Sequence, residues 1–154
     1  MSQAIPTIRS TDQKAGRETD MGAWGMGPFD NDGALDQLGD LDEVEAKDMT
    51  DRLALAMREI LDDAEYVEGP EMSGAVAVAC LVGARVIGTE PDDAAARWLE
   101  SNPFEPSTEL RDLARATIDR ATRPDDNELY ELWEDSGSLD RWLASLAPYR
   151  QALA

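Results

Sequence analysis

The feature that most constrains the fold is an uninterrupted apolar run of eleven residues, Gly74 to Ala84, which ends at the charged Arg85. The run is well short of the roughly 20 residues that a helix needs to cross a bilayer. It therefore predicts a buried helix over about 73–87, ended by Gly88. Because its side chains are small, neighbouring helices can approach it closely, which favours a position at the centre of a bundle.

The rest of the chain from Ala34 onward also repeats its apolar residues with helical spacing, and no stretch alternates with period two. Further helices are expected from the Asp30-Asn31-Asp32 cap to Leu41, Thr50 to Ala64, Thr89 to Asn102, Ser107 to Ala121, Asp125 to Gly137, and Ser138 to Leu153. A turn is expected at Gly69-Pro70, and the paired aspartates near helix ends are expected to act as caps or surface groups. The sequence thus predicts an all-α protein, a single-domain helical bundle of about six or seven helices around an Ala/Val-rich central helix.

The first 20 residues differ from the rest. They carry three acidic and three basic residues, so the whole net charge of -19 falls on residues 21–154. They hold few sizeable apolar side chains, and we expect them to form a disordered leader before a single domain over 21–154. One hypothesis is that Met21 is the native first residue.

Several function classes are excluded by composition. The absence of histidine removes Ser-His-Asp and Cys-His catalysis as well as imidazole zinc sites, and leaves only carboxylate chemistry. A net charge of -19 repels phosphate groups, so neither a nucleic acid nor an anionic membrane is expected as a partner. The single Cys80 cannot form an internal disulfide and no charged-then-apolar leader opens the chain, which indicates a cytoplasmic protein.

Residues 21–41, MGAWGMGPFDNDGALDQLGDL, are the unusual part of the sequence. The glycines at 22, 25 and 27 surround Trp24 and permit a tight backbone path. This path either seats Trp24 and Phe29 against the core, as an anchor for the first helix, or leaves Trp24 in a groove. The order of the glycines, and the lack of a following Lys or Ser/Thr, argue against a phosphate-binding loop.

The pattern MGAWGxGxFDNDxALDxLGDL in this segment is similar to the opening signature of domain-of-unknown-function family 4259 (DUF4259), a group of small bacterial proteins. The likeness continues more loosely through Glu65–Glu68, the Ala-rich helix and Asn127–Trp133. Members of the family typically begin at the methionine that matches Met21. The family has no established activity, so the resemblance implies one helical domain and carries over no catalytic residue and no cofactor.

The strongest functional hint is the charge of residues 30–71, where fifteen acids and three bases give a local net charge of -12. Such a field steers a basic protein toward the chain and speeds its capture. We therefore expect a non-enzymatic domain that binds another protein, a basic one, without a catalytic residue or cofactor. The residues expected to form this partner surface are Trp24, Gly25, Phe29, Asp30, Asn31, Asp32 and Asp36.

Two other functions remain open at this point, as does the interpretation that the acidic face has no binding role. Asp32, Asp36 and Asp40 are spaced to line one helix face, which would suit a carboxylate-dependent hydrolase using Mg²⁺ or Mn²⁺. The spacing of acids from Asp30 does not fit an EF-hand loop. The chain could also be a structural subunit of an oligomer, and the acidic face could serve solubility alone.

Overall fold

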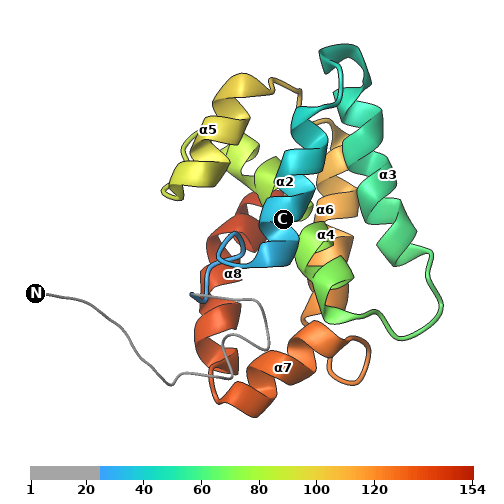
Figure 1. Cartoon of the computed structure of the whole chain (residues 1–154), viewed down its shortest axis with the longest axis vertical. Coiled ribbons are helices and arrows are strands. Elements are labelled where there is room, and N and C mark those ends of the chain that lie inside the picture. The colour runs from blue at the N-terminus through green and yellow to red at the C-terminus, as the bar shows by residue number, and fades with distance from the viewer. Residues whose placement is uncertain (1–24) are drawn as a thin grey trace, which may run out of the picture.

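The computed structural model describes residues 25–154, which contain seven α-helices, one short 3₁₀ helix and no strand (Figure 1). The helices are α2 (Asp32–Asp42), η2 (Ala46–Asp48), α3 (Met49–Leu61), α4 (Gly69–Ile87), α5 (Asp93–Ser101), α6 (Thr108–Ala121), α7 (Glu128–Ser136) and α8 (Leu139–Leu153). The predicted all-α bundle is confirmed. The leader predicted at residues 1–20 lies outside the described residues, as does Trp24.

Helix α4 is the core of the bundle, as its small apolar side chains predict. Fourteen of its nineteen residues are buried. Each of the other six α-helices packs against it, and Figure 1 shows α4 enclosed among them. Within residues 25–154, α4 is the one helix whose length and composition would suffice to cross a membrane, yet 72% of that window is buried inside the molecule. The apolar surface of α4 is therefore used for packing among helices.

The start of α4 differs from the prediction. The helix begins at Gly69, so the turn expected at Gly69-Pro70 is wrong. Pro70 lies in the first helical turn, where a backbone N–H has no helical partner and the fixed φ of proline suits the helix. The Gly69 N–H donates to Glu128 Oε1 at 2.7 Å, which ties the start of α4 to the first residue of α7.

Most helix starts follow ordinary capping chemistry. Four caps accept a hydrogen bond from the backbone N–H three residues later: Asn31, Asp92, Ser107 and Asn127. Thr50 is not a cap, because η2 leads directly into α3 at Met49. The start of α5 also lies later than the expected Thr89.

The cap predicted at Asp125 is wrong. Asp125 has φ +66°, and the cap is Asn127, whose buried amide also donates to the carbonyls of Arg120 and Ala121. This second role fixes the loop between α6 and α7. The predicted ends of α4 at Gly88 and of α7 at Gly137 are confirmed, and both glycines adopt the left-handed conformation.

Candidate functional site

The loop Gly25–Asn31, which carries part of the family-like signature, forms a tight turn at the start of α2. Asp30 Oδ2 accepts a hydrogen bond from the Gly27 N–H at 3.1 Å. A Cβ atom added at Gly25 or Gly27 would lie 2.6 or 2.8 Å from the same oxygen, closer than real contacts allow. The two glycines therefore leave the space that the Asp30 carboxylate occupies, and the turn explains why these residues occur together.

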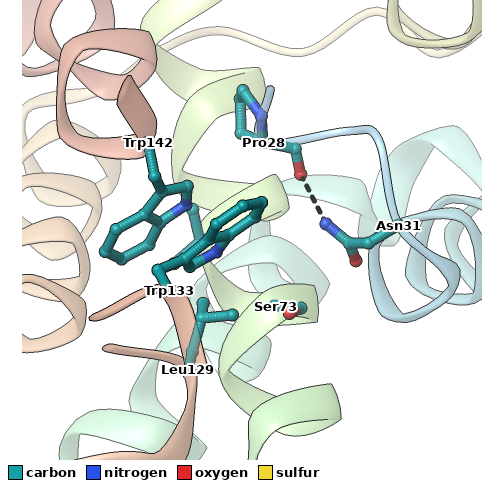
Figure 2. A pocket seen from close by; sticks show the side chains of 7 residues that line it. Pro28, Asn31, Ser73, Leu129, Trp133 and Trp142 are labelled. Carbon is teal, nitrogen blue, oxygen red and sulfur yellow. Dashed lines mark hydrogen bonds between the residues drawn. The ribbon is translucent and has the colours of Figure 1, made fainter. Parts of the chain in front are cut away.

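Asn31 and Phe29 extend this turn into the interior. The Asn31 side chain accepts from the Ala34 N–H at 2.8 Å and donates to the Pro28 carbonyl at 3.4 Å (Figure 2). Phe29 is 2% exposed, and its ring meets that of Tyr149 edge-on at 6.2 Å. The anchoring interpretation of Phe29 thus matches its position.

A small pocket lies beside this turn. It is lined by Pro28, Asn31, Ser73, Val76, Leu129, Trp133 and Trp142, which come from the turn, α4, α7 and α8 (Figure 2). The rings of Trp133 and Trp142 stack with 6.1 Å between centroids. The cavity volume is about 10 Å³, room for about one water molecule, whereas ligand pockets usually hold roughly 300–1,000 Å³. The pocket is therefore a packing junction and not a small-molecule site.

Tyr149 connects Phe29 to the far side of the bundle through its hydroxyl. The phenol donates to Glu90 Oε1 at 2.7 Å while its ring is buried against the core. Burial raises the pKa of the Tyr149 phenol well above its usual value, and the hydrogen bond to Glu90 adds to this effect. Burial likewise raises the pKa of the Cys80 thiol. Both groups bind their protons more tightly in the folded chain than in the unfolded chain.

The chain is therefore expected to lose stability in alkali. The stabilisation from a raised pKa is fully present below the unfolded value and is lost as the pH rises above it, from about 8.5 for Cys80 and about 10 for Tyr149. Tyr149→Phe is expected to lower the free energy of unfolding by about 1.5 kcal/mol near neutral pH, because it removes a hydrogen bond to a charged group. It should also flatten the decline above about pH 10. Urea unfolding at several pH values measures both effects, and an unchanged alkaline decline in the variant would contradict the assignment.

The outer face of α2 has a different character. Its solvent-facing residues follow helical spacing, and we call them the α2 face: Asp32, Leu35, Asp36, Gly39, Asp40 and Glu43, the last at the C-cap. The opposite side of the helix, with Ala34, Leu38 and Leu41, is buried. Leu35 is 37% exposed beside the row of carboxylates, although it is a large apolar side chain. Neither Leu35 nor Gly39 was expected from the sequence to take part in a site, since neither carries distinctive chemistry.

The bases of the described chain do not balance the negative charge of the α2 face through ion pairs. Within residues 25–154, no basic side chain forms an ion pair with Asp32, Asp36 or Asp40. Two of the bases in the acidic segment already have carboxylate partners, since Lys47 contacts Glu45 and Arg58 contacts Glu109. Further exposed acids continue from the end of α2 into α3: Asp42, Glu45, Asp48 and Asp51.

The six predicted site residues that the structure describes fall into three groups. Asp32 and Asp36 are exposed on the α2 face, whereas Phe29 and Asn31 are buried. Asp30 and Gly25 are half-buried in the turn. Across the part of the chain that the structure describes, no group of three or more His, Cys, Asp or Glu side chains is placed to hold a metal ion. The row of Asp32, Asp36 and Asp40 is an exposed charged surface.

The comparisons with known proteins give one match. The sequence model of the family described as "Domain of unknown function (DUF4259)" matches residues 22–145. No curated protein and no solved structure matches the chain. The matched range begins in the signature and reaches into α8, so it includes the turn, the α2 face and the central helix.

Proposed function

The chain belongs to the DUF4259 family, and from this premise we propose that it is a non-enzymatic protein-binding module whose partner is basic. The observation that carries the proposal is the row of exposed carboxylates Asp32, Asp36 and Asp40, which pair with no base among residues 25–154. Carboxylates that repel one another along a helix cost a little stability. A cationic partner removes this cost and is drawn to the surface by its field.

A macromolecular partner suits this surface better than a small molecule does. The α2 face is the outside of a helix, and small ligands bind in concave sites that enclose most of their surface. Leu35 offers an apolar contact among the carboxylates, and apolar contacts supply affinity that exposed charges alone do not. The module acts in the cytoplasm on this proposal, where its single free and buried cysteine stays reduced.

The test compares two variants that lose the same charge from different faces. The first is Asp32→Asn, Asp36→Asn, Asp40→Asn, and the matched control is Glu100→Gln, Asp112→Asn, Asp140→Asn, whose positions are also exposed. Each serves as bait in a lysate of the native host at about 50 and about 300 mM salt, because surface charges are screened at the higher value. The purified partner is then titrated against each protein.

The α2 variant is expected to bind the captured basic protein about tenfold more weakly than the wild type, at roughly 0.5 kcal/mol per exposed charge pair. The control should keep its affinity within about threefold, since only long-range attraction is reduced. An equal loss in both variants would show that total charge matters and the α2 face does not. Retention of no basic protein by the folded wild type at low salt would contradict the function.

A further inference from the structure

Gly39 is the least expected residue on the α2 face. It lies in the interior of α2, where glycine is less favourable than alanine because it restricts the unfolded chain least. A Cβ atom at Gly39 would meet nothing within 4 Å, so packing within the described chain does not require a glycine there. Gly33 of the same helix differs, since its Cβ would lie 2.8 Å from the Pro70 carbonyl oxygen of α4.

Gly39 leaves bare backbone on the exposed side of the helix, one turn after Leu35. The carboxylates Asp32, Asp36 and Asp40 form the neighbouring row on one side of these two positions, and Glu43 follows one turn after Gly39. A helix that carries an apolar side chain can place it over Gly39 and against Leu35, because a missing side chain lets two helices approach closely. The α2 face therefore offers bare backbone and one apolar side chain beside a row of carboxylates.

We propose that the α2 face receives an amphipathic helix of the partner, with apolar residues over Leu35 and Gly39 and Lys or Arg along the flank that meets Asp32, Asp36 and Asp40. This inference rests on the proposed function and specifies its partner. Asp32, Asp36 and Asp40 recur every four residues, about 6 Å along the axis, and cations four residues apart on a second helix have the same spacing. The carboxylate row therefore matches the basic flank of such a helix in both charge and spacing.

Other occupants fit this face less well. An extended peptide gains affinity by pairing its backbone with a sheet edge, and residues 25–154 contain no strand that offers such an edge. A second copy of the chain would bring another acidic α2 face and a further net charge of -19. A helix satisfies its own backbone hydrogen bonds, so it needs only the side-chain contacts that the α2 face provides.

The experiment uses the full chain and two synthetic peptides of identical composition, made of leucine, lysine and alanine. One peptide places its leucines on a single helical stripe, and the other has them scattered so that no face is apolar. Binding of each labelled peptide is followed by fluorescence anisotropy. The proteins are the wild type, Gly39→Gln, the Asp32/Asp36/Asp40 triple variant, and Ala144→Gln as a matched control at another exposed helical position.

The proposal expects the striped peptide to bind the wild type and Ala144→Gln equally, and Gly39→Gln about tenfold more weakly, because the glutamine side chain occupies the space over the bare backbone at residue 39. The scattered peptide should bind Gly39→Gln and the wild type alike, since it uses charge only. Circular dichroism of Gly39→Gln verifies its fold, which the open space around Gly39 should leave intact.

The two proposals fail in different ways. If Gly39→Gln binds the striped peptide as tightly as the wild type does, while the triple variant loses affinity, the helix-docking proposal is overturned and the acidic binding surface stands. If the triple variant binds both peptides as tightly as the wild type does, the assignment of the α2 face as the binding surface is wrong. If the wild type dimerises in sedimentation and Gly39→Gln does not, the occupant is a second copy and the proposal is overturned.

Discussion

Replacing Arg120 with alanine is expected to lower the free energy of unfolding by about 3–5 kcal/mol, the usual cost of breaking a buried ion pair from one side. Arg120 of α6 is 7% exposed, and its guanidinium joins two loops. It donates to the carbonyl oxygens of Ile60, Asp63 and Glu65 at and after the end of α3. It also pairs with the Asp126 carboxylate before α7, with 3.2 Å between Nε and Oδ2.

The large effect follows from what the substitution leaves behind. Three backbone carbonyls lose a charged donor, and Asp126 loses its buried partner. A hollow of about 430 Å³ beside Arg120 admits water to part of this region, so we expect a value near the lower end of the range. Urea unfolding followed by circular dichroism at neutral pH measures the change.

Arg123 supplies the control for this prediction. It contacts the same Asp126 carboxylate at 3.4 Å, but its side chain is 62% exposed. Arg123→Ala is expected to cost less than about 1 kcal/mol, as exposed ion pairs do. Similar losses for the two variants would mean that charge near Asp126 matters and that the buried hydrogen bonds of Arg120 do not.

The Arg120 contacts also show which part of the fold was not predictable from the sequence. Three of the partners are backbone carbonyls, which exist at every residue and leave no mark in the sequence. The partners lie 55 to 60 residues away along the chain, so no local pattern connects them to Arg120. The stack of Trp133 on Trp142 beside the Pro28 turn was not predictable either. Only the tertiary fold brings α7 and α8 next to that turn.

Local chemistry, in contrast, was predictable. The buried central helix followed from the run Gly74 to Ala84, and α6 followed from the apolar spacing between Leu110 and Ala121. The spacing of Asp32, Asp36 and Asp40 indicated one face of α2, on which all three are exposed. The sequence left open whether Phe29 is an anchor or a contact residue, because an aromatic side chain suits both roles and burial depends on Tyr149 of α8.

The second large effect is expected at Gly33, where alanine should lower the free energy of unfolding by about 1–3 kcal/mol, as overpacking usually does. Its Cβ would lie 2.8 Å from the Pro70 carbonyl oxygen and 3.0 Å from Ser73 Cβ. The first of these atoms belongs to the backbone of α4, so it cannot rotate away. Either α2 moves outward or the first turn of α4 shifts, and both changes disturb the contact between the two helices.

The matched variant is Gly39→Ala, the same substitution six residues later in the same helix. It is expected to raise the free energy of unfolding by about 0.5–1 kcal/mol, because alanine restricts the unfolded chain and nothing near Gly39 obstructs a methyl group. Urea unfolding of both variants under one set of conditions gives the two values. If Gly33→Ala lowers the free energy of unfolding and Gly39→Ala raises it, α2 needs a glycine where it crosses α4 and only tolerates one on its outer face. A stability loss at Gly39 would contradict the open space assigned to that position, and with it the reason for a helix to dock there.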